Sequence, residues 1–356
     1  MQATLVGLQH PHAMSHLATL QQLSEVESIA VCGESRADLE RVKDRQGAKV
    51  TAWHTDLGAL LDRCRPFFAI VCVRNDRGPA SFSRVLEAGV HLMAEKPIGR
   101  NAAETQQVLD TAAQGEALLS VCYQTRSYPV FRRMRSILRE GLLGELLSVE
   151  VRALYTQVKD RNPRHWLFNK EHAGGGVISW LGCHDLDRIR FITGEDYATV
   201  SAQVATRSGE DIDVEDMANL SLTLESGTLV SMHLGYVLGQ SGSGYHNSAG
   251  NDVYLGVNGR LGRMYMTGIG LGDASRLHVE TLHPAWNAAP RRTFEFEIAD
   301  SPAYCGVAGE NFIRSFVHAA QGRAEPPTTG EDALHVARVM DAAYASSDTG
   351  RRIALV

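Results

Sequence analysis

The first third of the sequence alternates short apolar segments with amphipathic ones, and this alternation limits the possible folds most strongly. Residues 67–73 are apolar at every position, which is typical of a parallel strand covered on both faces. Similar segments near residues 4–6, 28–32, 90–94 and 118–123 are separated by stretches with helical periodicity. Strands joined by helices of this length form right-handed crossovers. Residues 1–122 are therefore predicted to form a doubly wound α/β domain of the nucleotide-binding type.

The pattern changes after Tyr123. A helix is predicted over residues 130–140, and a second one after the glycine run at Gly174. An alternating segment at residues 146–155 lies between these helices. Further ones follow at residues 198–206, 218–224, 229–236, 252–257, 263–267 and 292–298, and helices near residues 310–320 and 331–345 close the chain. Residues 123–356 are thus predicted to form a second α/β domain with a large, mainly antiparallel sheet. The glycine- and serine-rich insert at residues 239–251 is interpreted as a mobile lid or as a surface loop.

Composition excludes several classes of partner. The 356 residues carry a net charge of −6, so the chain lacks the basic surface that nucleic acids and anionic membranes attract. No apolar run approaches the roughly 20 residues of a membrane span. The six cysteines form no CxxC pair and lie mostly within apolar runs. We therefore expect reduced, packed thiols and a cytoplasmic protein.

The turn after the first strand is a candidate nucleotide site. A dinucleotide-binding turn has three glycines in the pattern GxGxxG, so that bare backbone can approach a pyrophosphate. Only the first is present here; Gln9 and His12 occupy the other two positions. The residues assigned to the cofactor are Gly7, Gln9, His10, Pro11 and His12. His10, His12 and His16 also suggest metal ligands, but no acidic or cysteine ligand is close in sequence, and no metal is predicted.

The end of the second strand bears on the choice of nucleotide. A carboxylate at such a strand end binds the ribose hydroxyls of NAD, and Glu34 is the only acid available. Ser35 and Arg36 would instead suit the 2′-phosphate of NADP. A solvated turn without a ligand is the third interpretation.

Glu95, Lys96 and Pro97 lie at the end of another strand of the first domain, where ligands bind in open α/β sheets. The chain has only five lysines, so a lysine at this place is less easily explained as a general surface charge. An ammonium group beside an alcohol or carbonyl oxygen polarises it. Lys96 is therefore a candidate catalytic residue.

Residues 174–187 form the third candidate motif. Trp180, His184 and Asp187 have spacings of four and three residues, which places them on one face of a helix. The glycines before this helix allow close approach to another backbone or to a ligand. The imidazole of His184 would accept a proton from an alcohol. The alternative is a packed histidine that is hydrogen-bonded to Asp187.

Taken together, these motifs resemble the glucose–fructose oxidoreductase, inositol dehydrogenase and MocA family. The match includes the first turn, residues 74–75, 95–97, 124–129, 166, 174–187, 329–333 and 346–352. The resemblance implies a Rossmann-type domain followed by an α/β domain whose open sheet often makes oligomer contacts, and hence a homodimer or homotetramer. Family members mostly oxidise a secondary alcohol of a sugar, cyclitol or related polyol with NAD(P). Lys96 and His184 match the family's active-site lysine and histidine.

The sequence departs from the family pattern in three places. Two glycines of the first turn are missing, the usual acid position at the second strand is Gly33, and an aspartate common in the family is Trp180 here. An indole suits stacking on a sugar ring. The resemblance adds Arg74, Asn75, Glu95, Lys96 and Pro97 to the cofactor site, and gives Lys96, Arg126, Tyr128, Trp166, Trp180 and His184 as substrate contacts. Arg164, His165, Tyr245 and His246 are further candidates.

The leading hypothesis is an oxidoreductase that uses NAD or NADP, with NAD favoured, on a sugar-like alcohol. His184 would exchange the hydroxyl proton, and Lys96 would hold and polarise the oxygen. One alternative is redox-neutral use of bound NAD for elimination, epimerisation or glycoside cleavage. Another is a non-catalytic protein of the same fold that senses a nucleotide or a sugar.

Overall fold

The computed structural model describes residues 1–45, 47–239, 251–267 and 275–355. These residues form two compact units. Residues 1–127 and 299–334 make up the first, and residues 128–298 and 335–356 the second. Candidates Tyr245 and His246, and most of the insert at 239–251, lie outside the described residues.

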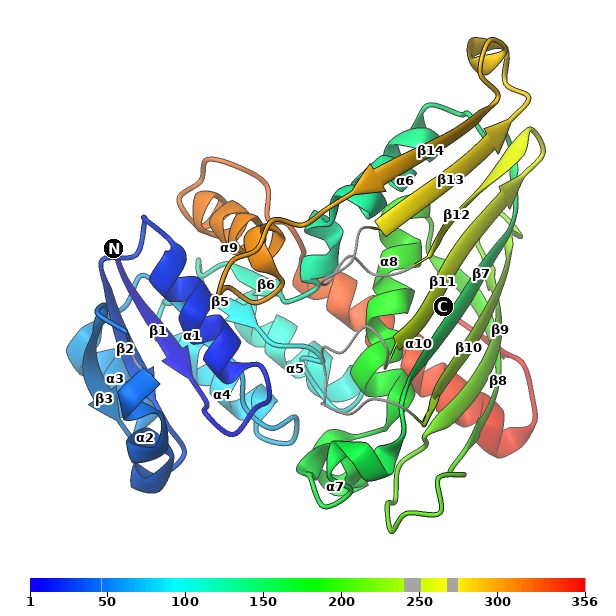
Figure 1. Ribbon diagram of the computed structural model, residues 1–356. Coiled ribbons are helices and arrows are strands. Elements are labelled where there is room, and N and C mark those ends of the chain that lie inside the picture. The colour runs from blue at the N-terminus through cyan, green and yellow to red at the C-terminus, as the bar shows by residue number, and fades with distance from the viewer. Residues whose placement is uncertain (46, 240–250, 268–274, 356) are drawn as a thin grey trace. The chain divides into compact units, whose positions relative to one another are not determined.

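The first unit is built on a parallel sheet, which has six strands among the described residues, in the order β3-β2-β1-β4-β5-β6 (Figure 1). Its strands are β1 (Gln2–Val6), β2 (Ser28–Cys32), β3 (Val50–His54), β4 (Phe68–Val71), β5 (His91–Ala94) and β6 (Leu119–Val121). β1 pairs with both β2 and β4, so the strand order reverses next to β1. In a doubly wound sheet, this switch point is where ligands bind.

Helices cover both faces of this sheet. They are α1 (Ala13–Gln22), α2 (Arg36–Val42), α3 (Leu57–Cys64), α4 (Gly78–Glu87), α5 (Ala102–Ala112) and α9 (Gly306–Ala320). The side chains of Ser35, Asp56 and Asn101 accept backbone hydrogen bonds at the starts of α2, α3 and α5. The fully apolar residues 68–71 are completely buried, as expected for a strand with helices on both sides. The predicted doubly wound α/β fold is confirmed.

Residues 299–334 belong to the first unit, although the sequence analysis assigned all of residues 123–356 to the second domain. Phe312 and Phe316 of α9 are fully buried in one apolar cluster with Leu17 of α1 and the sheet. Thr328 is hydrogen-bonded to β6. The Ser120 hydroxyl donates to the Thr328 carbonyl oxygen at 2.8 Å, and the Thr328 hydroxyl is bonded to the backbone of Val121. A returning helix has no local signal that tells which sheet it will cover.

The second unit contains the larger sheet, with nine strands among the described residues, in the order β14-β13-β12-β11-β7-β10-β9-β8-β15. The strands are β7 (Leu146–Thr156), β8 (Tyr197–Ala205), β9 (Met217–Leu224), β10 (Leu229–Leu238), β11 (Asn251–Gly259), β12 (Gly262–Thr267), β13 (Ser275–Thr281), β14 (Arg291–Phe296) and β15 (Ile353–Ala354). All neighbours are antiparallel except β7 and β10, which confirms the predicted mainly antiparallel sheet. The sequence pattern did not indicate β3, β13 or β15.

One face of the larger sheet is covered by α6 (Pro129–Arg139), α8 (Cys183–Thr193) and α10 (Gly330–Thr349), and a short helix α7 (Lys170–Ala173) lies near its end (Figure 1). The other face bears no helix among the described residues. Burial alternates along the strands: Val149, Val151 and Ala153 of β7 are buried, whereas Glu150 and Arg152 between them are exposed. Across the described parts of the chain, no helix is both long and apolar enough to cross a membrane.

Candidate functional site

The turn after β1 depends on its single glycine. Gly7 has a φ of +95°, a conformation that side chains disfavour. A Cβ at this position would lie 2.2 Å from the carbonyl oxygen of Cys72, directly after β4. Gly7 is therefore needed for the close approach of two neighbouring strand ends.

Glu34 is fixed against this turn. Its carboxylate oxygens accept hydrogen bonds from the backbone N–H groups of Leu8, at 2.8 Å, and Gln9, at 3.2 Å. The Gln9 side chain donates to Asp38 at 2.9 Å, and Ser35 caps α2 through the Asp38 backbone. A carboxylate has room for about four hydrogen bonds, so Glu34 can also accept from hydroxyl groups of a ligand. Arg36 is exposed.

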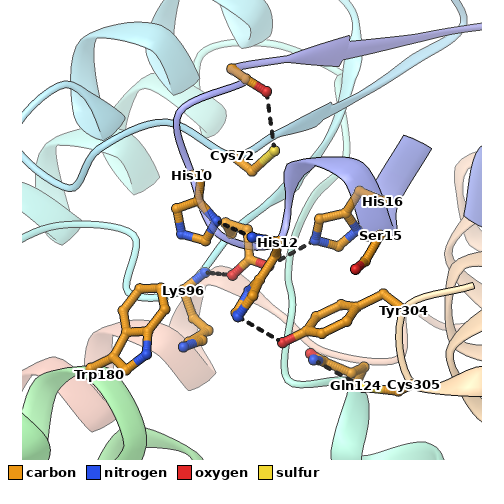
Figure 2. Close-up of polar contacts among 12 residues, drawn as sticks. His10, His12, Ser15, His16, Cys72, Lys96, Gln124, Trp180, Tyr304 and Cys305 are labelled. Atoms are coloured by element: carbon orange, nitrogen blue, oxygen red, sulfur yellow. Dashed lines mark hydrogen bonds and ion pairs between the residues drawn. The ribbon is translucent and has the colours of Figure 1, made fainter. Parts of the chain in front are cut away.

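His10, His12 and His16 gather near Lys96 (Figure 2), and two of them contact Glu95. The Glu95 side chain is buried, and its Oε1 lies 2.8 Å from His12 Nδ1 and 2.7 Å from His16 Nε2. Its Oε2 accepts the backbone N–H of Lys96 at 2.9 Å. Tyr304 Oη lies 3.0 Å from His12 Nε2. His12, at the third glycine position of the turn, thus points into the interior and connects α1 with the end of β5.

Burial governs the charges of this cluster. It lowers the pKa of His12 to about 4 and the pKa of His10 well below its usual value. Burial alone would raise the pKa of Glu95, but His12 and His16 hold the pKa of that carboxyl well below its usual range. At neutral pH, Glu95 is therefore ionised, and the imidazoles of His10 and His12 are neutral.

Two groups of potential metal ligands occur here. They are His10, His12 and Glu95, and His16, Glu95 and Cys122, with ligand atoms within 4.8 Å of one another in each group. No acidic or cysteine ligand is close to these histidines in the sequence, but the fold brings both kinds to them. Because Glu95 Oε1 already accepts from two imidazoles, hydrogen bonding accounts for its position. That the protein uses no metal stays a prediction.

The other predicted cofactor residues of the first unit also follow strand ends. Lys96 is 1% exposed, and the Lys96–Pro97 peptide bond is cis. Arg74, after β4, forms two hydrogen bonds of 2.7 Å with Asp76, and the neighbouring Asn75 is buried. The fold thus brings residues 7–12, 74–75 and 95–97 to the carboxyl edge of one sheet. Figure 2 shows Lys96 on this edge with His10 and His12.

In the second unit, His184 does not lie on one regular helix with Trp180, which corrects the sequence prediction. Ile178–Gly182 form a π-helical turn, and α8 begins only at Cys183. The regular helical period is therefore interrupted between the two residues. Trp180 is 2% and His184 8% exposed, while Asp187 is completely buried. Single π-turns within helices are frequent at functional sites.

The glycines before this turn allow close contact with other parts of the chain. A Cβ on Gly176 would lie 1.9 Å from the backbone oxygen of Glu215, and one on Gly175 would lie 2.0 Å from Tyr344 Oη. The buried Glu215 carboxylate accepts the N–H groups of Gly176, at 2.8 Å, and Ile178, at 2.9 Å, and the Tyr344 hydroxyl at 3.0 Å. Burial raises the pKa of Glu215. Glu215 therefore anchors the start of the turn that carries Trp180.

The predicted substrate contacts have different surroundings. Arg126, in the first unit, lies 3.0 Å from the Asp332 carboxylate. In the second unit, Tyr128 is buried and stacks on Phe131, with ring centroids 6.1 Å apart. Trp166 and Trp180 meet edge to face at 6.0 Å. Two more candidates from the sequence lie beside Trp166: Arg164 is exposed, and the His165 ring is 5.4 Å from the indole.

No sequence motif indicated Tyr304 or Glu215, and the spacing of His16 suggested only a possible metal ligand. Tyr304 is 292 residues from His12, and Glu215 is 39 residues from Gly176. No local pattern marks either contact. The four-residue spacing of His12 and His16 indicates that both side chains lie on one helix face, where they can contact the same group. It does not indicate that this group is Glu95.

Both parts of the chain match models of one protein family. Residues 2–123 match the NAD-binding Rossmann fold of the oxidoreductase family, and residues 131–264 match the GFO/IDH/MocA C-terminal domain. A 1,5-anhydro-D-fructose reductase from Ensifer adhaerens is 24% identical over 70% of this chain and 68% of its own. An inositol 2-dehydrogenase from Rhizobium meliloti is 25% identical over 94% of this chain and 96% of its own.

A solved structure extends the similarity to the whole fold. Levoglucosan dehydrogenase, in complex with NADH and levoglucosan, superposes with a TM-score of 0.84 at 17% identity. The superposition covers 99% of each chain. At this level of identity, the likeness shows a common fold.

We expect the stability of the first unit to fall in mild acid. The unfolded chain takes up a proton at His12 near pH 6.5, whereas the folded protein does so only near pH 4. Between these values the unfolded state binds more protons, so the free energy of unfolding decreases as the pH falls, by about 3 kcal/mol in total for this residue. Urea unfolding at pH 7, 5.5 and 4.5 measures the slope. An equally steep slope in folded His12→Gln would contradict this assignment.

Removing one carboxylate oxygen should loosen the start of the π-turn. In Glu215→Gln, an amide N–H₂ replaces an oxygen that accepts a hydrogen bond, so one buried donor loses its partner. We expect a loss of about 1–3 kcal/mol in the free energy of unfolding. The exposed Glu225→Gln is the matched control. Equal melting temperatures for the two variants would show that Glu215 does not anchor the turn.

Proposed function

Because the chain belongs to the Gfo/Idh/MocA family of oxidoreductases, we propose that it oxidises a secondary alcohol of a sugar, cyclitol or related polyol, or reduces the corresponding ketone. The observation that carries this proposal is the position of Lys96. It is a buried lysine at the carboxyl end of β5, and its backbone N–H is bound to the ionised Glu95. A charged donor fixed at the ligand edge of the sheet suits the oxygen of an alcohol or ketone.

The first unit fits a dinucleotide. Glu34 is oriented by two turn amides at the end of β2, which leaves acceptor capacity for ribose hydroxyls. The turn at residues 7–12 would receive the pyrophosphate at the start of α1, with Arg74, Asn75 and residues 95–97 on the neighbouring strand ends. When bound, a nicotinamide supplies the acceptor or donor of hydride. The fixed carboxylate of Glu34 would repel a 2′-phosphate, which favours NAD over NADP.

The proposed roles of the two central residues differ. Lys96 would donate hydrogen bonds to the substrate oxygen and stabilise negative charge that develops on it. His184, in the second unit, would take up the hydroxyl proton and return it in the reverse direction. The perpendicular Trp166–Trp180 pair offers an aromatic surface for the apolar face of a sugar ring.

The open face of the larger sheet is proposed as the contact between copies of this chain, in a homodimer or homotetramer. Ser201, Ser221 and Ser231 are directly opposite one another on β8, β9 and β10. Small polar side chains in register make a flat surface, on which a second sheet can pack closely.

Replacing Lys96 should reduce turnover far more than nucleotide binding. Lys96→Met keeps most of the side-chain length but removes the charge and its donors. On the best polyol found in a screen for NADH production, we expect kcat to fall at least about a hundredfold, or about 3 kcal/mol. The NAD dissociation constant, measured by calorimetry, should change much less. Near-normal turnover in folded Lys96→Met and His184→Asn would contradict both roles.

Glu34 should set the preference between nucleotides. We expect NAD to raise the melting temperature at sub-millimolar concentration, and more than NADP does. Glu34→Ser should weaken NAD binding at least about tenfold and narrow the gap to NADP, since charge repulsion is removed. An absence of any shift with either nucleotide would refute the proposed cofactor site.

If copies of the chain associate through the open sheet face, a large side chain on that face should weaken the oligomer. Light scattering should give a mass of two or four chains for the wild type. Ser221→Arg places a large charged side chain between Ser201 and Ser231. The measured mass should then fall toward that of a single chain, while the circular dichroism spectrum stays unchanged. A wild type that is monomeric at micromolar concentration would rule out the proposal.

A further inference from the structure

The hydrogen bonds around Glu95 have a fixed direction. An ionised carboxylate only accepts, so His12 must donate its Nδ1–H to Glu95 Oε1. A neutral imidazole has one N–H, so His12 Nε2 carries a lone pair and accepts the hydroxyl proton of Tyr304 at 3.0 Å. The hydrogen bonds therefore run from the Tyr304 hydroxyl to the His12 imidazole and from there to the Glu95 carboxylate.

This is the order in which a general base activates a hydroxyl group in other enzymes. The Nε2 atom of His12 is available as an acceptor, because the single N–H of the ring lies on Nδ1 and is donated to Glu95. When the ring takes up a proton, the adjacent Glu95 carboxylate offsets part of the cost of burying the imidazolium. His16 Nε2, 2.7 Å from the same oxygen, holds that carboxylate in place.

Tyr304 is held where it can meet a ligand. Its backbone N–H donates to Thr19 Oγ1 of α1 at 2.9 Å, and its ring lies 4.5 Å from the His12 ring and 5.1 Å from the His16 ring, measured between centroids. The residue is only half-buried. Figure 2 shows its hydroxyl directed at His12, on the carboxyl edge of the sheet that also carries Lys96. A donor, Lys96, and a hydroxyl backed by a base thus share one edge.

We propose that Tyr304, His12 and Glu95 form a proton relay, and that Tyr304 is a further acid–base residue of this oxidoreductase. The role in the reaction rests on the proposed function. In this route the substrate hydroxyl gives its proton to Tyr304 Oη, which is an alternative acceptor to His184, while the phenol proton moves to His12 Nε2. The electron pair of the substrate C–H bond leaves as the hydride that a bound nicotinamide accepts. Tyr304 ends neutral, and His12 ends as an imidazolium beside the Glu95 carboxylate.

The activated phenol can be detected without nucleotide or substrate. Acetylation by N-acetylimidazole at pH 7.5, followed by peptide mass spectrometry, gives the rate at Tyr304 relative to that of N-acetyltyrosine amide in the same solution. His12→Gln removes the base, and we expect the rate at Tyr304 to fall at least tenfold. His16→Gln is the matched control, because it also removes an imidazole from Glu95 Oε1 and a ring from beside Tyr304, but not the acceptor of the hydroxyl. Its rate should stay within about threefold of the wild type.

A solvent isotope effect tests the relay in the wild type, independently of how the variants fold. We expect acetylation of Tyr304 to be about twofold slower in D₂O, because proton removal accompanies attack. No isotope effect, no reaction at Tyr304, or equal rates in the two folded histidine variants would overturn the relay.

Turnover tests the role of the relay in the reaction. With a polyol that the wild type oxidises, Tyr304→Phe should lower kcat about a hundredfold while the NAD dissociation constant stays within about twofold. An unchanged kcat would overturn the catalytic role. The acetylation measurements contain no nicotinamide and no sugar, so failure of the relay is distinguishable from failure of the proposed function.

Discussion

The buried carboxylate of Glu95 is the interaction on which the candidate site in the first unit depends. A buried charge is costly unless it is paired and hydrogen-bonded. Here the fold supplies imidazole N–H groups from His12 and His16 and the backbone N–H of Lys96. These bonds connect the start of α1 with the end of β5. They therefore fix the backbone of Lys96 relative to the turn after β1.

The same interaction accommodates the two side chains that replace glycines in the turn after β1. In the family pattern, bare backbone at the second and third glycine positions gives room for a ligand and for helix packing. Gln9 and His12 instead direct their side chains to Asp38 and Glu95, within the unit. The missing glycines are thus accommodated by specific hydrogen bonds. His12 acquires a chemical function that glycine lacks, because its second nitrogen accepts the Tyr304 hydroxyl.

A buried carboxylate has a comparable structural role in the second unit. Glu215 accepts two backbone N–H groups at the start of the π-turn, and glycines at positions 175 and 176 allow the approach. The turn itself interrupts the helix before His184. In both units, then, a segment with candidate catalytic residues begins where a buried glutamate accepts backbone hydrogen bonds, one at Glu95 and two at Glu215. The pKa values of the two glutamates are shifted in opposite directions, since His12 and His16 lower the pKa of Glu95 whereas burial raises the pKa of Glu215.

The sequence by itself determined the features that depend on local periodicity. The alternation of apolar strands and helices predicted the doubly wound sheet, and strand ends located Gly7, Glu34 and Lys96, because the carboxyl edge follows from chain direction alone. Only the tertiary structure decided that residues 299–334 return to the first unit, that Tyr304 reaches His12, and that Glu95 joins two histidines. These contacts join segments up to 292 residues apart. They depend on which buried surfaces and polar groups complement each other once the sheet has formed, and local spacing contains no record of that.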